Sequence, residues 1–154
     1  MLKQLKTLAV AGLMGLTATS AQASAFDPED AVKYRQALYQ VMSAQMNVMG
    51  GMLQGRQEFS AEAVNERARN IGMAGSLLGE TYFPETAGVD SSRLLSRAWD
   101  DMPGFQAKGA EFGQALTALI EASSQEGFDV RQARSAIGAV QRGCRSCHDD
   151  YRAR

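Results

Sequence analysis

Apolar residues recur at spacings of three and four positions in four stretches of the chain, and this spacing is typical of amphipathic α-helices. The first stretch follows Asp27, which suits an N-cap, and Pro28, which suits the first helical position. It continues to about Met49, where Gly50 and Gly51 weaken a helix. The predicted helices span residues 28 to about 49, 61–78, 104–123 and 130 onward, with Ser60 and Asp129 as N-caps of the second and fourth.

The sequence shows no strict alternation of apolar and polar residues of the kind that marks a half-buried strand. The pattern therefore predicts an all-α protein built as a four-helix bundle. Residues 80–103 form the longest connection between helices, and they contain Pro84, Gly88 and a short helical turn near Leu94. A connection of this length can cross one end of a bundle.

The first predicted helix is apolar over a wide face made of two adjacent stripes. One bundle core covers only part of such a width, so a cofactor or a second subunit must cover much of the rest. The stripes are Tyr39, Met42, Met46, Met49 and Leu53, and Tyr34, Leu38, Val41, Val48 and Met52.

Residues 1–23 have the pattern of a secretory signal peptide, in which Lys3 and Lys6 precede an apolar run and small residues follow. Cleavage after Ala23 or Ala25 leaves one domain over residues 24–154. The apolar run is too short to span a bilayer. We therefore expect export to the bacterial periplasm.

The charge balance excludes several classes of partner. The formal net charge is −1, and loss of the two lysines of the signal peptide changes it to −3. Because no basic tail or stripe remains, nucleic acid is not an expected partner. No predicted helix resembles a membrane-surface helix, so we expect no membrane partner either.

The strongest chemical signal is the motif C-x-x-C-H, formed by Cys144, Cys147 and His148. In an exported protein this spacing indicates covalent attachment of a c-type haem, because each thiol can add to one vinyl group and the imidazole can bind the iron. Positions separated by three and four residues share one face of a helix, so all three side chains reach one flat macrocycle. The motif uses both cysteines and the only histidine of the chain.

Three other readings of the motif are weaker. A redox C-x-x-C motif is expected beside a βαβ pattern, which the sequence lacks. A structural zinc site needs four ligands, whereas this cluster supplies three. A disulfide would leave His148 without a role.

In the fourth predicted helix the core stripe continues directly into the cysteine motif. We therefore expect haem to replace ordinary side-chain packing at one end of the bundle. Gly143, just before the motif, either allows close approach of the backbone to the haem ring or is a neutral helix position. The stripe consists of Val130, Ala133, Ile137, Val140, Cys144, Cys147 and Tyr151.

These features together resemble the cytochrome c′ family of class II c-type cytochromes. The resemblance rests on the opening segment Pro-Glu-Asp-Ala-Val-Lys-Tyr-Arg-Gln at residues 28–36, and on C-x-x-C-H followed by Asp-Asp-Tyr-Arg at residues 149–152. It spans the whole mature chain. The resemblance implies an antiparallel up-down four-helix bundle that carries one covalently attached haem c near its C-terminus.

The resemblance also implies roles for residues around the haem. His148 is the expected axial ligand of the iron. Tyr39 stands, in an alignment without gaps, where methionine-ligated relatives have their ligand, so the family pattern implies five-coordinate iron with the Tyr39 ring over the distal face. Arg35 matches a position near the haem propionates. Met42, one turn from Tyr39, is a candidate neighbour of the haem edge.

On the proximal side, Arg152 follows His148 by four residues. That spacing predicts that its guanidinium lies beside the imidazole, on the same helical face. A cation at this position would disfavour additional positive charge on the iron.

Haem iron with a vacant sixth position favours binding of small diatomic gases such as nitric oxide and carbon monoxide over dedicated electron transfer. The alternative is a low-spin electron carrier with a redox partner protein, in which a methionine of the first helix supplies the sixth ligand. Catalysis is not expected, because a peroxidase would want a distal base and no second histidine exists.

The surplus apolar surface of the first helix predicts a homodimer built from the first two helices. We expect Met46, Met49 and Met52 to form the exposed row at the interface. Because Tyr39 lies on the same helix, its displacement by an entering gas is expected to affect that interface.

Overall fold

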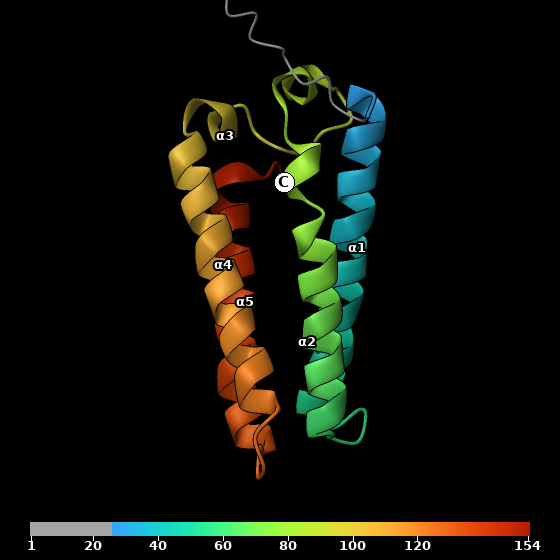
Figure 1. Cartoon of the computed structure of the whole chain (residues 1–154), viewed down its shortest axis with the longest axis vertical. Coiled ribbons are helices and arrows are strands. Elements are labelled where there is room, and N and C mark those ends of the chain that lie inside the picture. Colours follow the sequence, from blue (N-terminus) through green and yellow to red (C-terminus); the bar gives the residue numbers. More distant parts are fainter. Residues whose placement is uncertain (1–25) are drawn as a thin grey trace, which may run out of the picture.

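The structure is a computed structural model that describes residues 26–154, so the predicted signal peptide lies outside the described residues. The described chain folds into two antiparallel helix pairs, α1 with α2 and α4 with α5, and a single-turn helix α3 precedes α4 (Figure 1). The predicted all-α, up-down four-helix bundle is confirmed. The helices are α1 Pro28–Leu53, α2 Ala61–Ser76, α3 Arg97–Asp100, α4 Met102–Ser123 and α5 Val130–Tyr151.

The predicted N-caps are all formed. The side chains of Asp27 and Ser60 accept hydrogen bonds from backbone N–H groups in the first turns of α1 and α2. Asp129 and Gln132 form a reciprocal capping box, in which each side chain accepts the backbone N–H of the other at 2.8 Å. These local bonds explain why the sequence located the helix starts well.

The helix ends deviate from the prediction. α1 continues through both glycines to Leu53, because Met49, Gly51 and Met52 are buried there and core packing outweighs the low helix propensity of glycine. α2 ends at Ser76, two residues before the predicted end at residue 78. α4 includes Pro103 in its first turn.

The predicted exposed row of methionines on α1 is wrong. Met49 is fully buried and Met52 is 7% exposed, so both belong to the bundle core, and only Met46 is half-buried. Met49 belongs to one predicted stripe and Met52 to the other, so the bundle core covers part of both stripes. The large apolar side chains that α1 does expose are Tyr39, at 36%, and Val41, at 45%.

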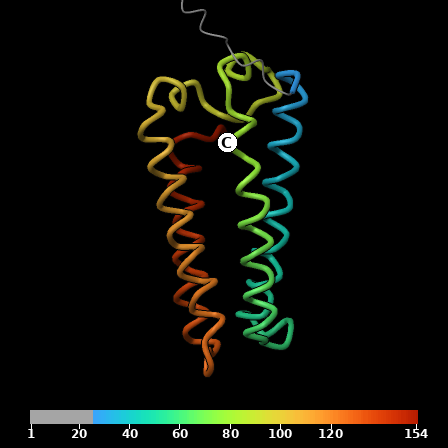
Figure 2. The backbone as a smooth tube through the Cα atoms, in the orientation of Figure 1, coloured from blue at the N-terminus to red at the C-terminus, as the bar shows by residue number. Residues whose placement is uncertain are grey.

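The connection between α2 and α4 crosses the end of the bundle where α5 terminates (Figure 2). It contains two 3₁₀ turns, Gly79–Thr81 and Pro84–Gly88, which form the linker together with α3 and the residues between them. The linker also holds the end of the chain. Leu95 N–H donates to the Tyr151 carbonyl at 2.9 Å, and Ala153 N–H donates to the Arg93 carbonyl at 2.8 Å.

None of the helices within residues 26–154 is both long enough and apolar enough to cross a membrane.

Asp101 joins the start of α4 to the end of α5. Its carboxylate accepts a hydrogen bond from the Gly104 N–H at 3.1 Å and another from the Tyr151 hydroxyl at 2.8 Å. The Tyr151 bond, followed by the Gly104 bond, lowers the pKa of Asp101. The ionised carboxylate is thus the form that stabilises this junction.

Acid titration tests this junction. A carboxyl whose pKa is lowered on folding stabilises the protein above its ordinary pKa of 3.8, and this contribution is lost as the pH falls below that value. We therefore expect Asp101→Asn, which cannot ionise, to show a weaker loss of stability on acidification than wild type. Denaturant unfolding of the holoprotein at a series of acidic pH values measures it. The control is Asp100→Asn, and an equal pH dependence in both variants contradicts the assignment.

Gly143 of α5 lies directly against Phe112 of α4. A Cβ atom at Gly143 would stand 3.2 Å from the Phe112 Cα and 3.4 Å from its Cβ. The first of these atoms belongs to backbone, which yields less easily than a flexible side chain. Gly143 therefore makes room for α4, a helix-helix contact that the sequence did not predict.

Two alanine substitutions on α5 separate close packing from helix propensity. Gly138→Ala places its Cβ 3.5 Å from the flexible end of Arg142, so it should gain the ordinary ~1 kcal/mol of helix propensity. In Gly143→Ala, the cost of displacing Phe112 should offset that gain in stability. Equilibrium unfolding measures both, and a gain at Gly143 equal to that at Gly138 would show that the contact imposes no constraint.

Candidate functional site

The cysteine motif occupies the last two turns of α5, close to the linker. Cys144 and Cys147 are half-buried free thiols and do not form a disulfide with each other. Burial raises the pKa of both thiols. Two thiols one turn apart on a regular helix form the arrangement expected for attachment to one macrocycle.

His148 extends from the same part of α5. Partial burial lowers its pKa, and the positive charge of Arg152 lowers it further. A lowered pKa favours the neutral imidazole, which is the form that binds a metal ion. His148 is thus suited to act as the axial ligand.

Arg152 lies just beyond the last helical residue of α5. α5 ends at Tyr151, and Arg152 adopts an extended backbone conformation as the C-cap. The backbone bonds of its neighbours to residues 93 and 95 pull the chain out of the helix at this point. The Arg152 N–H nevertheless donates to the His148 carbonyl at 3.2 Å, and the Arg152 charge acts on the imidazole, in agreement with the predicted nearness of the two residues.

A pair of tyrosines lies within electrostatic range of the attachment motif. The hydroxyl oxygens of Tyr39 in α1 and Tyr82 in the linker are 2.9 Å apart. Burial is the largest cause of the raised pKa of each phenol, and negative charge on Cys147 would raise both further. Two segments that are distant in sequence thus meet beside the motif of α5.

Arg35 is a buried cation whose terminal hydrogen-bond donors need a partner. It is only 4% exposed, and its guanidinium carbon lies 4.3 Å from the centre of the Tyr82 ring. Neither terminal nitrogen has a hydrogen-bond partner among the described residues. A buried cation with free donors requires an anion, and a haem propionate carboxylate fits that requirement. The side chains present therefore fit the cofactor that the cysteine motif implies.

Aromatic packing and one ion pair support the site from α4. The Phe105 ring contacts the rings of Tyr82 and Tyr151, with centroids 5.2 and 5.4 Å away. Lys108 donates to the Ser146 hydroxyl within the C-x-x-C-H motif at 2.6 Å and pairs with Asp150 at 3.3 Å. α4 thus holds both the Tyr82 ring of the linker and the attachment motif in place.

The remaining predicted residue, Met42, is 7% exposed and belongs to the apolar core cluster together with Leu38 and Met49. The sequence did not identify Tyr82, Phe105 or Lys108. Tyr82 comes from a connection without helical periodicity, and only its contacts in three dimensions reveal its role.

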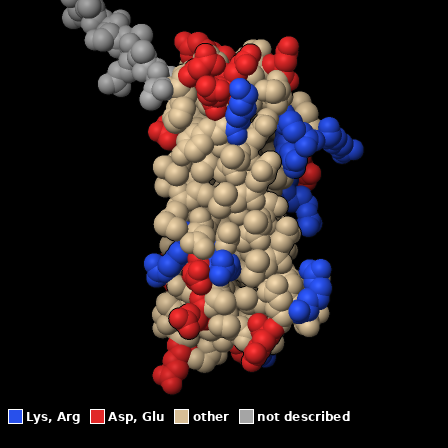
Figure 3. All heavy atoms as spheres, turned by 90° about the vertical axis from the view of Figure 1, so that its right-hand side faces the viewer, with Lys and Arg blue, Asp and Glu red and all other residues tan. Residues whose placement is uncertain are grey.

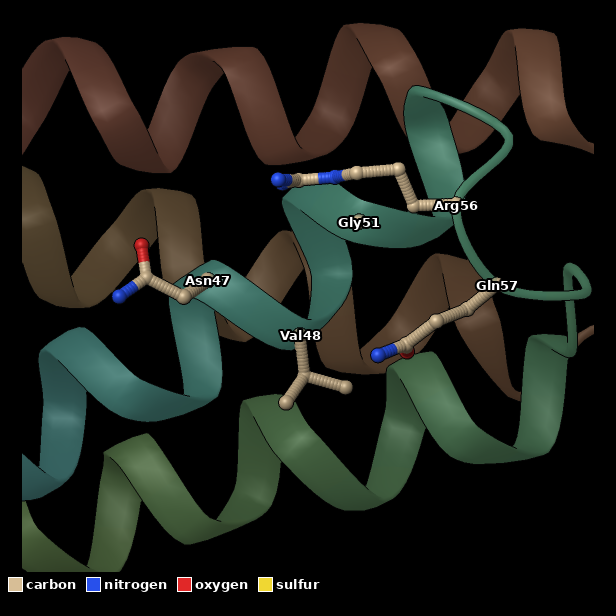
Figure 4. A pocket seen from close by; sticks show the side chains of 5 residues that line it. All are labelled: Asn47, Val48, Gly51, Arg56 and Gln57. Atoms are coloured by element: carbon tan, nitrogen blue, oxygen red, sulfur yellow. The ribbon is translucent and has the colours of Figure 1, made fainter.

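Two shallow hollows lie on the described surface. One lies beside the turn between α1 and α2, where Val48, Gly51 and Gln57 line it with Asn47 and Arg56 (Figure 4). This turn is at the end of the bundle opposite the cysteine motif (Figure 1). The other, at the end of α5, is lined by Arg97, Asp100, Asp101, Asp150 and Tyr151. Neither hollow contains the cysteine motif.

Comparisons with known proteins agree with this site. Residues 30–152 match the family model described as Cytochrome C′. The cytochrome c′ of Halomonas halodenitrificans is 35% identical over 132 residues, which cover 82% of this chain and 98% of the relative.

Two solved structures share the fold. A cytochrome c′ described as having an unusual ligand-controlled dimer dissociation aligns with a TM-score of 0.75 and 28% identity, covering 84% of this chain and 98% of that one. A nitric oxide complex of a cytochrome c prime variant from Alcaligenes xylosoxidans aligns with a TM-score of 0.74 and 26% identity, covering 83% and 97%. With a family match across nearly all described residues and the C-x-x-C-H motif on α5, this chain belongs to the cytochrome c′ family, whose members carry covalently bound haem c.

Proposed function

We propose that this protein is a periplasmic haem protein whose five-coordinate iron binds small diatomic gases, nitric oxide and carbon monoxide among them. The observation that carries the proposal is the hydrogen-bonded tyrosine pair beside the attachment motif, in a chain whose only histidine is His148. A relative of known structure forms a complex with nitric oxide, which supports the same chemistry here. A carrier or scavenger of nitric oxide is the role that follows.

In this proposal each residue of the site holds or shields the haem. Cys144 and Cys147 would bind it through thioether bonds, and the neutral imidazole of His148 would bind its iron. Arg35 would pair with a propionate, and the Tyr39 ring would shield the side on which a gas binds. The iron of the bound haem supplies the position that a gas occupies.

The alternative is an electron-transfer cytochrome with a methionine as second axial ligand and a redox partner protein. Met42 is the methionine nearest in sequence to Tyr39, one turn away on α1. Its burial in the core cluster beside Leu38 and Met49 disfavours this role, because ligation would remove an apolar side chain from the core. We propose no catalytic residue in this protein.

The periplasmic location rests on the signal peptide predicted over residues 1–23. Covalent attachment suits such a location, because thioether bonds retain the haem outside the cytoplasm.

Optical spectra test the open site. We expect the reduced holoprotein to give a high-spin spectrum that shifts when carbon monoxide is added, because five-coordinate iron accepts a further ligand. A low-spin spectrum that carbon monoxide leaves unchanged would contradict the open site and favour methionine ligation. The spectrum of Met42→Leu then identifies the ligand, since loss of a Met42 ligand would make the variant high-spin.

We further propose a homodimer in which α1 and α2 of two copies pack together. α1 has no charged side chain between residues 36 and 53, and Val41 in this stretch is 45% exposed. Figure 3 shows the corresponding face, where a broad uncharged band separates charged groups nearer the two ends. The described dimer dissociation of a relative with the same fold supports association of this kind.

Sedimentation of paired variants tests the dimer. A carboxylate buried in an apolar interface is costly, so Val41→Asp should weaken dimerisation by about tenfold or more. The control is Val130→Asp, because Val130 is 41% exposed at the start of α5 and lies outside the proposed interface. A monomeric wild type, or equal dimerisation of both variants, contradicts the assignment of the interface.

The same measurement tests coupling between gas binding and association. Tyr39 and Val41 belong to the same helix, so displacement of the Tyr39 ring by a gas shifts the helix that forms the proposed interface. We expect carbon monoxide to weaken the dimer of the reduced protein, and an unchanged dissociation constant would show that the two events are independent.

A further inference from the structure

The hydrogen bond between Tyr39 and Tyr82 joins α1 to the linker. Tyr39 belongs to the middle of α1, and Tyr82 lies 43 residues later in the linker. Their hydroxyl groups form one hydrogen bond, with an oxygen-oxygen distance of 2.9 Å. The position of each ring therefore depends on the other.

Tyr82 is the better fixed partner. Its ring contacts the Arg35 guanidinium, 4.3 Å from the ring centre, and the Phe105 ring, whose centre is 5.2 Å away at an interplanar angle of 64°. Its backbone N–H donates to the Gly79 carbonyl at 3.3 Å and closes the first 3₁₀ turn. Tyr82 is thus held by its backbone and by two contacts of its ring.

The linker around Tyr82 is also anchored in the protein interior. Thr81 and Thr86 are fully buried, and their hydroxyls donate to the carbonyls of Leu78 and Phe83 at 2.7 and 2.8 Å. These bonds satisfy polar groups that burial would otherwise leave unpaired. The segment that carries Tyr82 is therefore rigidly placed.

Tyr39 is held less tightly. The bond to Tyr82 is the hydrogen bond that its side chain makes with the described residues. If the pair separates, the Tyr39 side chain is the one that can rotate, because Tyr82 keeps its contacts with Arg35 and Phe105.

We propose that Tyr82 is a positioning residue that holds the Tyr39 ring through the hydroxyl pair and thereby limits how fast a small gas reaches the haem. The inference rests on the proposed function, in which Tyr39 covers the gas-binding side. Entry of a gas requires Tyr39 to move, and movement breaks the bond to Tyr82. Tyr82 acts through Tyr39 and need not touch the gas.

The strength of one hydrogen bond sets the size of the effect. A neutral hydrogen bond in a protein changes an equilibrium constant by about two- to tenfold. Removing the bond should therefore raise the population of the displaced Tyr39 ring by about that factor. The association rate constant for carbon monoxide should rise equally, while the proximal ligand His148 remains unchanged.

The experiment is a double-mutant cycle on the reduced holoprotein, with wild type, Tyr39→Phe, Tyr82→Phe and the double variant. Stopped-flow mixing with carbon monoxide measures the association rate constants. We expect about a two- to tenfold increase for either single variant and no further increase for the double variant, because each substitution removes the same bond. Tyr34→Phe, on the same helix but stacked on Phe26, is the control and should match wild type.

Denaturant unfolding of the same four proteins provides a readout that does not depend on gas. Coupling between the two substitutions supports the hydroxyl pair, and additive effects on the free energy of unfolding overturn it. A rate increase from Tyr82→Phe that persists in the Tyr39→Phe background also overturns the inference, because it would reflect general loosening of the linker.

The outcomes separate this inference from the proposed function. If wild type does not bind carbon monoxide, the proposed function fails and the inference fails with it. If wild type binds carbon monoxide and Tyr82→Phe binds it at the same rate, the inference alone is overturned.

Discussion

The buried guanidinium of Arg35 is the constraint on which the haem end of the bundle depends. A cation removed from water is strongly destabilising unless an anion and hydrogen bonds compensate for its lost hydration. The Tyr82 ring compensates in part, yet both terminal nitrogens lack partners among residues 26–154. The protein chain alone thus leaves this end electrostatically incomplete, and we propose that a haem carboxylate supplies the missing charge. In this proposal, cofactor binding and correct placement of α1 against the linker are coupled.

The two ends of the molecule are stabilised by different interactions. Near the turn between α1 and α2, Met49 and Met52 are buried, and the Phe59 and Phe128 rings lie 6.2 Å apart, so apolar packing dominates. At the other end, hydrogen bonds and aromatic contacts connect the linker to α4 and α5, and an ion pair joins α4 to α5. A continuous apolar core holds one end, which allows the other to carry polar chemistry.

Sequence patterns predicted the features that depend on local interactions. Asp27, Ser60 and Asp129 cap helices through bonds within one turn, and the spacing of Cys144 and Cys147 follows from helical geometry alone. Periodicity identified the apolar stripes of α1 but not which neighbour covers each one, so the row of Met49 and Met52 was expected at the surface. Their burial depends on where α2 packs, which is a tertiary property.

The missed parts of the site depend on contacts between distant segments. Tyr82 lies in a connection without periodicity, and only the folded linker brings it to Tyr39. Gly143 was ambiguous because the closeness of Phe112 depends on the separation of α4 from α5. The end of α5 before Arg152 depends on backbone bonds to residues 93–95, which the sequence pattern near Arg152 does not reveal. Local rules describe none of these contacts.

The absence of charged side chains between residues 36 and 53 of α1 has a consequence for solution conditions. Salt screens interactions between charges and has little effect on contacts between uncharged surfaces. Contacts made by this part of α1 should therefore be nearly insensitive to ionic strength. Because burial of apolar surface near room temperature is driven mainly by entropy, such contacts should weaken on cooling. Temperature, and not salt, is the variable to which this surface responds.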